Sequence, residues 1–320
     1  MALLQDARDQ VDRAFTGGPR GLDMENAFGG ATSAFRRRYA RDLSGYDVAI
    51  TGVPFDGAVT HRPGARFGPR AVREASTLQV FDPPWGWDGY SPLEALAVAD
   101  YGDCGFDYAR TPDFPVALRD HVRGILGQGA ACLAIGGDHS VSLPILEAHA
   151  EVHGPLALIQ FDAHSDTWPD DDADRIDHGT MFYKAVKAGV IDPAGSVQVG
   201  IRTVNDDPLG IETISARDVR EAGTADVAAR IRARVGDRPA YLSFDIDALD
   251  PAFAPGTGTP VWGGLTSGQA ADLLRDIAGV RLVGGDVVEV SPPYDTTGAT
   301  AVAGAHVLME LLCLWGWTRR

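Results

Sequence analysis

The residues best suited to chemistry in this sequence form three short motifs, and each motif follows an apolar run. The first motif places Asp162, His164 and Asp166 at alternate positions after the run 156–159. Because side chains alternate along an extended backbone, these two carboxylates and one imidazole would point to the same side. Oxygen and imidazole donors that converge in this way bind divalent cations.

Two further motifs enlarge the donor set. Asp245 and Asp247 end the apolar run 241–244, and His139 follows another, 131–135. Six donors with four carboxylates are too many and too rich in oxygen for one tetrahedral zinc ion. They suit hard or borderline cations such as Mn(II), and they can hold two ions if carboxylates bridge them. The predicted metal ligands are His139, Asp162, His164, Asp166, Asp245 and Asp247.

The blander interpretation is that such residues cap strands or form salt bridges at strand ends. That interpretation would suffice for a lone Asp-x-Asp pair, but three motifs at the ends of three strand-like runs favour metal binding.

The motifs resemble the signature motifs of the ureohydrolase family, which includes arginase and agmatinase. The segments that carry the likeness are 136–140, 162–166, 243–251, 254–260 and 287–292. They extend over most of the chain. The segments 178–183 and 197–203 are similar to those of the bacterial agmatinases within that family.

The resemblance implies a three-layer α/β/α fold of the arginase/deacetylase type, with a mainly parallel sheet. It also implies two Mn(II) ions that share a hydroxide, and this hydroxide would attack a guanidinium carbon. The expected ligand assignment is that Asp162 and Asp245 bridge the ions, His139 and Asp166 complete one site, and His164 and Asp247 complete the other.

Two residues outside this set gain a role from the resemblance. His178 is expected to carry a proton to the leaving amine, and imidazole is the side chain suited to that near neutral pH. Glu289 is expected to face the substrate guanidinium, and Asp166 to act in catalysis as well as in metal binding. Without the family, His178 reads as a helix-start or surface residue and Glu289 as a buried salt-bridge partner.

The identity of the guanidine depends on the segment 167–175, which is strongly acidic where arginase has Asn and Ser. Acidic residues repel a substrate carboxylate but not an ammonium. The sequence therefore predicts hydrolysis of agmatine to putrescine and urea, and a small cationic guanidine as substrate. A guanidino-acid hydrolase stays open, because Arg175 could pair with a carboxylate and a run of Asp can be plain solvated surface.

Other classes of protein fit the residues less well. A metal-free relative kept as a binding or assembly protein would not need the complete donor set. A deacetylase of similar fold uses one metal and would leave His139 and Asp166 unexplained. A dinucleotide-binding oxidoreductase would show G-x-G-x-x-G after the first strand, and the sequence does not.

Composition excludes further partners. The net charge of -16, from 28 Lys and Arg against 44 Asp and Glu, is unsuited to nucleic acid, and the run 36–38 of three Arg is expected to be a solvated or intersubunit patch. Cys104, Cys132 and Cys313 are expected to be buried thiols of a cytoplasmic protein. No segment is expected to span a membrane, which needs ~18 apolar residues.

Alternating strand-like and helix-like segments must position these motifs. Although a short apolar run can also belong to a buried helix, repeated βα units predict a parallel sheet whose carboxyl-terminal edge carries the site. The expected strands are 48–53, 131–135, 156–159, 197–201, 241–244 and 281–284, and the expected helices are 4–15, 71–76, 114–126, 225–235, 267–277 and 302–314. We expect one catalytic domain, 41–320, after an N-terminal arm, 1–40. By analogy with the family, we expect a homo-trimer or homo-hexamer.

Overall fold

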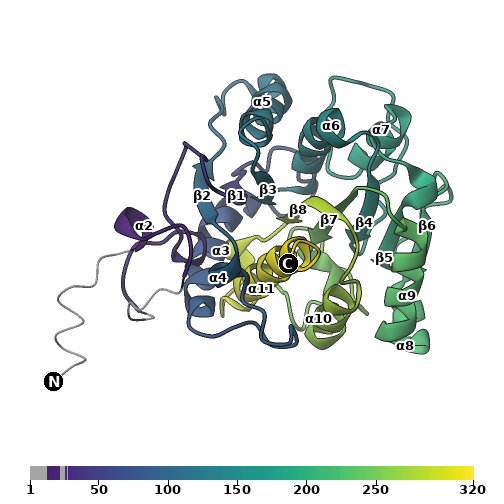
Figure 1. Ribbon diagram of the computed structural model, residues 1–320. Coiled ribbons are helices and arrows are strands. Elements are labelled where there is room, and N and C mark those ends of the chain that lie inside the picture. Colours follow the sequence, from purple (N-terminus) through teal and green to yellow (C-terminus); the bar gives the residue numbers. More distant parts are fainter. Residues whose placement is uncertain (1–12, 22–25, 27) are drawn as a thin grey trace.

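A single eight-stranded parallel sheet forms the centre of the protein (Figure 1). The computed structural model describes residues 13–21, 26 and 28–320. The strands are β1 (Val48–Gly52), β2 (Val98–Asp103), β3 (Ala131–Ile135), β4 (Ala157–Phe161), β5 (Val197–Ile201), β6 (Glu212–Ser215), β7 (Ala240–Asp245) and β8 (Leu282–Val288). Their order across the sheet is β2-β1-β3-β8-β7-β4-β5-β6.

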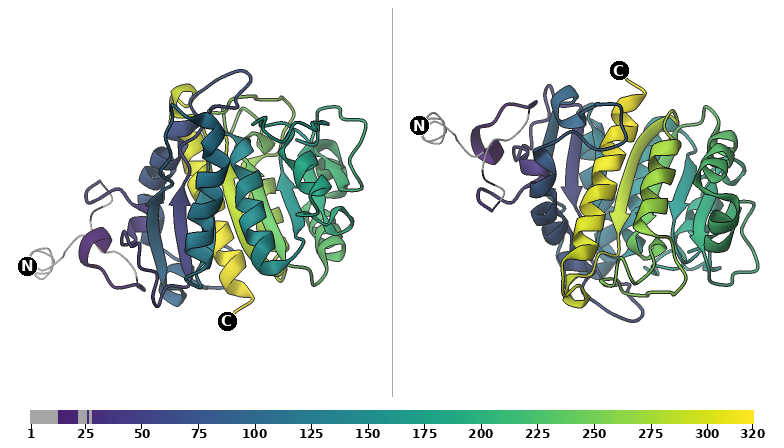
Figure 2. Two further views of the ribbon diagram at one scale, coloured as in Figure 1. Left: turned by 90° about the horizontal axis from the view of Figure 1, so that it is seen from above. Right: turned by 90° about the horizontal axis from the view of Figure 1, so that it is seen from below.

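Helices cover both faces of this sheet (Figure 2). Their bounds are α2 (Arg13–Thr16), α3 (Gly68–Ser76), α4 (Pro92–Ala95), α5 (Phe114–Leu126), α6 (Ser142–His153), α7 (Met181–Lys187), α8 (Ala216–Ala222), α9 (Thr224–Val235), α10 (Ser267–Asp276) and α11 (Ala299–Trp317). The helices α5, α6 and α7 pack on one face, and α3, α9, α10 and α11 pack on the other. The predicted three-layer α/β/α fold is therefore confirmed.

The central strands are mostly apolar because both of their faces are buried. In β3, Leu133 packs into the core shared with α11, whereas its neighbours Cys132 and Ala134 pack into the core shared with α5 and α6. All five residues of β3 are buried. This arrangement fixes the register of the strand, so the residues that follow it emerge at one defined edge.

The last helix, α11, resembles a membrane span in length and composition but is a core helix of this protein. Its 19 residues are long and apolar enough to cross a membrane, and α11 alone meets that test among the described residues. The helix instead packs against β8, α3 and α10 inside the protein. Burial on several sides explains the apolar composition.

Part of the predicted arm also differs from expectation. Arg36 and Arg37 are both 1% exposed, so the interpretation of the Arg run as a solvated patch is wrong for these two residues. Their guanidinium groups donate to backbone carbonyls, among them those of Thr77 and Gly21. Most of the helix expected at 4–15 lies outside the described residues.

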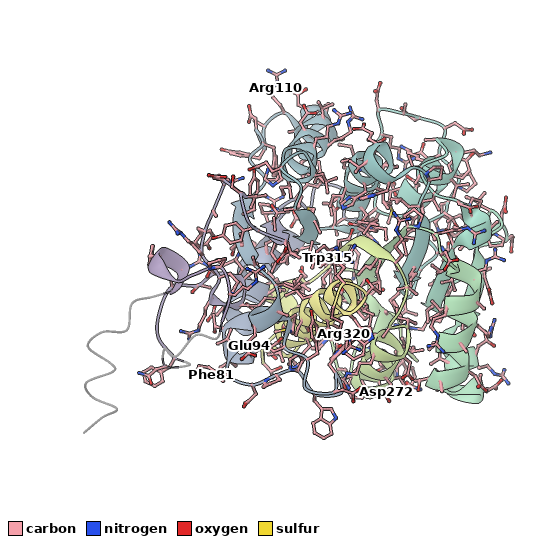
Figure 3. The ribbon with its side chains drawn as sticks, viewed as in Figure 1. Phe81, Glu94, Arg110, Asp272, Trp315 and Arg320 are labelled. Atoms are coloured by element: carbon pink, nitrogen blue, oxygen red, sulfur yellow. The ribbon has the colours of Figure 1, made fainter. Side chains whose placement is uncertain are left out.

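The surface carries the charge that the composition predicts. Arg110 and Asp272, for example, point away from the body of the protein (Figure 3). Cys104, Cys132 and Cys313 are buried free thiols, as expected.

The three predicted motifs lie where β3, β4 and β7 end, at the carboxyl-terminal edge of the sheet. One close approach fixes the 136–140 motif, which contains His139, against the loop after β1. A Cβ at Gly137 would collide with the backbone carbonyl of Phe55, so only glycine lets the loop after β3 pass there. His139 then begins the short 3₁₀ turn His139–Val141, which precedes α6.

Candidate metal centre

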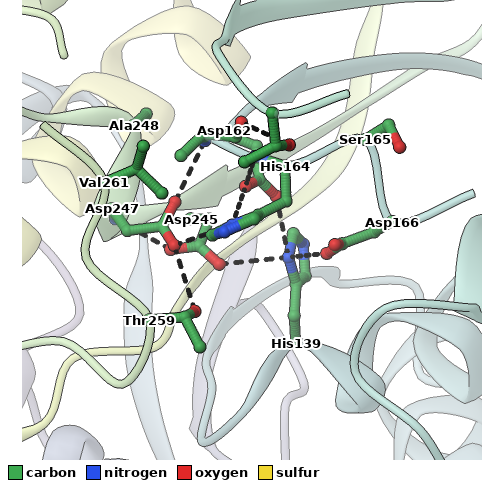
Figure 4. Close-up of polar contacts among 12 residues, drawn as sticks. His139, Asp162, His164, Ser165, Asp166, Asp245, Asp247, Ala248, Thr259 and Val261 are labelled. Carbon is green, nitrogen blue, oxygen red and sulfur yellow. Dashed lines mark hydrogen bonds and ion pairs between the residues drawn. The ribbon is translucent and has the colours of Figure 1, made fainter. Parts of the chain in front are cut away.

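His139 lies among carboxylates from the other two motifs (Figure 4). Its Nδ1 atom is 3.1 Å from Asp162 Oδ2, 2.9 Å from Asp166 Oδ2 and 3.2 Å from Asp245 Oδ2. The His139 side chain is 1% exposed. Although these oxygens are close, Nδ1 has no correctly oriented hydrogen bond among the described residues. Several donors around one point without directed hydrogen bonds form the arrangement that a cation requires.

His164 forms a second cluster beside the first (Figure 4). Its Nδ1 atom is 3.4 Å from Asp162 Oδ1 and 3.1 Å from Asp247 Oδ2. The side chain is 25% exposed, so this cluster is more open than that of His139. The structure therefore brings all six predicted ligands together in two adjoining groups.

Asp162 is common to both groups because each of its oxygens faces a different histidine. Its carboxylate is held by the side-chain amide of Gln160 and by the backbone N–H of His164, at 2.8 Å and 2.7 Å. Asp245 differs, since its Oδ2 faces His139 while its Oδ1 accepts the backbone N–H of Asp247. Asp162 thus faces both histidines, as a bridging ligand would, and the bridging roles of Asp162 and Asp245 stay predictions.

A buried polar chain orients the His139 ring from beneath. The Ser243 hydroxyl donates to Asp286 Oδ1 at 2.6 Å and lies 2.8 Å from His139 Nε2. Because the hydroxyl has one hydrogen, it must accept the Nε2–H of His139. In the neutral ring, Nδ1 then carries the lone pair and points at the carboxylates. Asp286 also accepts the hydroxyls of Ser142 and Tyr241, both at 2.8 Å.

Burial and the close approach of these carboxylates shift their pKa values. Burial and the charge of Asp162 raise the pKa of Asp166 to about 6. Burial and neighbouring carboxylates likewise raise the pKa values of Asp245 and Asp247. Burial alone would raise the pKa of Asp162 as well, but the two adjacent imidazoles lower it below the usual range. Divalent cations would remove the repulsion that these shifts express, so the donor set fits them.

His178 and Glu289 lie together next to the carboxylate cluster. Glu289 Oε1 is 2.9 Å from His178 Nδ1 and accepts the backbone N–H of His139 at 3.0 Å. The other oxygen, Oε2, is buried without a hydrogen-bond partner among the described residues. On the opposite side of the ring, Nε2 of His178 is 2.9 Å from the hydroxyl of Thr60 and 3.2 Å from its backbone N–H.

Two of the predicted site residues have an unusual backbone conformation. Asp166 and Glu289 adopt φ angles of +52° and +62°, in the left-handed region that non-glycine residues rarely occupy. Such strain costs of order 1–3 kcal/mol and is found where the surrounding structure holds a side chain in a required direction. It is consistent with the functional roles predicted for both residues.

A pocket of 260 Å³ opens onto the cluster. It is lined by His164, Asp166, Asp245, His178, Thr60, Trp168, Asp177, Gly179 and Thr259. A larger cavity of 540 Å³ lies between α10 and α11, where apolar residues such as Leu274 and Val302 line it. The smaller pocket is the candidate active site, because it contains the converging polar groups.

Several supporting residues were not predicted from the sequence. Gln160 and Gln198 are buried in β4 and β5, and Gln198 donates to Gln160 Oε1 at 2.7 Å. Arg202 donates to the backbone carbonyl of Asp247 at 2.6 Å and to that of Val261 at 2.8 Å. A polar residue within an otherwise apolar strand is the sequence signal that could have indicated the two glutamines.

Known proteins are similar to this chain over most of its length. The sequence profile of the arginase family matches residues 46–313. The chain is 52% identical to a Chromobacterium violaceum protein named agmatinase, over 92% of this chain and 91% of the other. It is 48% identical to agmatinase of Neisseria meningitidis, over 84% and 87% of the two chains.

Solved structures agree with the sequence matches. The crystal structure of a hypothetical agmatinase from Burkholderia thailandensis superposes with a TM-score of 0.93, at 54% identity, covering 95% of this chain and 97% of that one. Proclavaminate amidino hydrolase from Streptomyces clavuligerus gives 0.88 at 39% identity, covering 92% and 100%. The family match and these relatives extend over the three motifs and the sheet that positions them, and the chain belongs to the arginase family.

Proposed function

We propose that this protein hydrolyses agmatine to putrescine and urea at a centre that holds two Mn(II) ions. The observation that carries the proposal is the position of Asp162, whose two oxygens face the two histidines and join two donor clusters into one. The relatives named agmatinase support the choice of substrate. The predominance of carboxylates supports manganese over softer metals.

The six donors divide between two ions. His139 and Asp166 would hold one ion, His164 and Asp247 the other, and Asp162 and Asp245 would contact both. When bound, two divalent cations supply Lewis acidity and generate a nucleophile from water at neutral pH.

Glu289 is suited to orient the guanidinium group. Its Oε1 is engaged by His139 and His178, whereas its buried Oε2 has no hydrogen-bond partner among the described residues. A planar cation that donates to a carboxylate forms a strong and directional hydrogen bond. A guanidinium N–H would satisfy this oxygen and present its carbon to the metal cluster.

His178 is suited to deliver the proton that the leaving amine needs. Glu289 accepts its Nδ1–H, so proton exchange takes place at Nε2. The backbone N–H of Thr60 faces Nε2 and favours the neutral ring, while the Thr60 hydroxyl can either donate to a bare Nε2 or accept from a protonated one. Both protonation states of His178 therefore have a partner, as a proton shuttle requires.

A substrate panel tests the proposal. Urea release is measured from agmatine, arginine and 4-guanidinobutanoate with protein loaded with Mn(II), and the metal content of the same sample is determined. We expect two ions per chain and a clear preference for agmatine. Preference for 4-guanidinobutanoate would refute the proposed substrate in favour of a guanidino-acid hydrolase. Lack of turnover on all three guanidines would instead favour a binding or assembly protein.

The rest of the proposal concerns organisation. We propose one catalytic domain, 41–320, preceded by an arm, 1–40, in a cytoplasmic homo-trimer or homo-hexamer without nucleic-acid or membrane partners. Light scattering of the purified full-length chain tests the assembly, and a monomer at micromolar concentration would contradict it.

A further inference from the structure

The loop after the 162–166 motif contains the acidic segment 167–175, continues through Asp177, and contributes one carboxylate to the active-site pocket. Among the described residues that line the pocket, Asp177 is the aspartate from this loop. Asp170 is held by Lys184 at 3.0 Å, and Asp171 accepts the Tyr183 hydroxyl at 2.9 Å. Solvation or local pairing therefore accounts for most of the run, whereas Asp177 lines the pocket in addition to making local contacts.

The side chain of Asp177 faces the pocket together with the ring of Trp168. A Cβ added at Gly179 would lie 3.4 Å from Asp177 Oδ1 and 3.6 Å from Trp168 Cδ1. Gly179 itself lines the pocket, so the carboxylate and the indole flank the space that this glycine leaves open. The backbone N–H of Gly179 donates to Asp177 Oδ1 at 2.8 Å and fixes the carboxylate in this position.

The other carboxylate oxygen of Asp177, Oδ2, forms an ion pair with Arg175 that a substrate cation can replace. Arg175 donates to Asp177 Oδ2 at 2.7 Å, but its own side chain is 57% exposed. Ion pairs with such exposure contribute little and compete poorly with a better placed cation. Arg175 lines a neighbouring cavity, which Asp177 also lines, but it does not line the active-site pocket. It is therefore poorly placed to attract a substrate carboxylate.

We propose that Asp177 determines substrate specificity by binding the primary ammonium at the end of the substrate remote from the guanidine. The methylene chain would lie along Trp168, which lines the pocket and is half exposed. A carboxylate binds an ammonium through charge-assisted hydrogen bonds and repels a second carboxylate. This inference rests on the proposed function, since it concerns how that same site selects a diamine-type guanidine.

The test compares two substrates that differ in the ammonium alone. Agmatine and n-butylguanidine are assayed with the wild type and with Asp177→Asn. We expect kcat/KM for agmatine to fall about 10- to 100-fold, mainly through KM, which is typical of a lost charged hydrogen bond. The value for n-butylguanidine should change less than about twofold. Because each variant is judged by the ratio of two substrates, a partly unfolded preparation leaves the result unchanged.

Asp174→Asn is the matched control, because Asp174 is exposed in the same loop and does not line this pocket. It should alter neither substrate. Equal losses on both substrates in Asp177→Asn would overturn the inference and leave Asp177 as a mere support for His178. An unchanged preference for agmatine would overturn it too.

Arg175→Gln supplies an independent arm. Release of Asp177 from its partner should keep or lower KM for agmatine. If this variant instead lost a wild-type activity on 4-guanidinobutanoate, Arg175 would be the residue that recognises the distal group, against the inference. The two proposals fail separately: a wild type inactive on agmatine refutes the proposed function, whereas an active wild type whose preference survives Asp177→Asn refutes only the role of Asp177.

Discussion

The two histidine sides of the candidate metal centre differ in support and in exposure. The His139 ring is 1% exposed and is oriented from beneath by Ser243 and Asp286. The His164 ring is 25% exposed, and its described contacts come from the carboxylates of Asp162 and Asp247.

A symmetric set of ligand types therefore need not make two equivalent sites. A ring whose tautomer and direction are fixed before binding loses little freedom when it coordinates a cation. A more exposed ring keeps access to water and to exchange. We therefore expect the His139 side to hold its ion more tightly than the His164 side.

Replacement of Asp162, which both clusters share, should have the largest effect, because both sides lose a ligand. In Asp162→Asn, both clusters lose the carboxylate that joins them. We expect activity on agmatine to fall roughly 10³-fold or more, and metal content to drop below two ions per chain. Metal analysis of the purified variant, beside the wild type, checks this. A variant that keeps two ions and most activity would contradict the shared role of Asp162.

The second prediction concerns how stability depends on pH on the buried His139 side. Glu289 contacts both His139 and His178 there. Burial lowers the pKa of His178, but Glu289 and nearby carboxylates outweigh it and raise the pKa from 6.5 to about 9. A raised folded-state pKa stabilises the protein fully below pH 6.5, and this stabilisation is lost as pH rises through 9. The difference corresponds to an upper bound of roughly 3 kcal/mol.

Urea unfolding of the metal-free protein at pH 6 and pH 9.5 measures this effect. The wild type should lose stability between the two pH values relative to His178→Gln, which lacks the titrating ring. Parallel pH profiles for the two proteins would show that the His178–Glu289 pair contributes nothing.

The polar chain beneath His139 provides a test of the comparison itself. Ser243→Ala and Asp286→Asn should each weaken Mn(II) binding on the His139 side about 10- to 100-fold, a range typical of residues that orient a ligand. Ser142→Ala is the matched control, because Ser142 donates to Asp286 without touching Ser243 or His139 in the described hydrogen bonds. Calorimetric titration of the metal-free protein gives the two affinities. Equal weakening of both sites would contradict the expected difference between the His139 and His164 sides.

The smallest expected effect is on the rate at which the ions leave. After addition of a chelator, we expect the ion on the exposed His164 side to dissociate a few times faster, so that a species with one ion accumulates. Electron paramagnetic resonance distinguishes coupled manganese pairs from single ions. His164→Asn should retain the slow ion and His139→Asn should lose it, and the reverse pattern would contradict the asymmetry.

The sequence predicts the centre of the fold better than its margins. The strand 131–135 and the helix 114–126 have the bounds that were expected, because the strand is one apolar run and the helix has apolar residues at helical spacing followed by glycine. The edge strands β2 and β6 were not expected. Both are partly exposed, and their short polar sequences, VADYGD and ETIS, lack the apolar run that marks a strand buried on two faces.

The same limit applies to the site. Its six ligand-type residues could be collected from the sequence because each lies at the end of an apolar run. Ser243 and Asp286 could not be connected, since a polar residue in one strand acquires its meaning only from the strand that pairs with it. Asp177 lies just beyond the acidic segment 167–175, and only its position in the pocket wall distinguishes it from the aspartates of that segment.

The order of strands in the sheet has a consequence for biosynthesis. The strands β4 and β7, which carry Asp162, His164 and the 245–247 motif, pair directly with each other. The strand β3, which leads to His139, is joined to them through β8, which follows all the other described strands along the chain. A nascent chain can therefore assemble the His164 half early, but the His139 half must wait until β8 has been inserted. Premature termination before β8 would yield a product with half a centre.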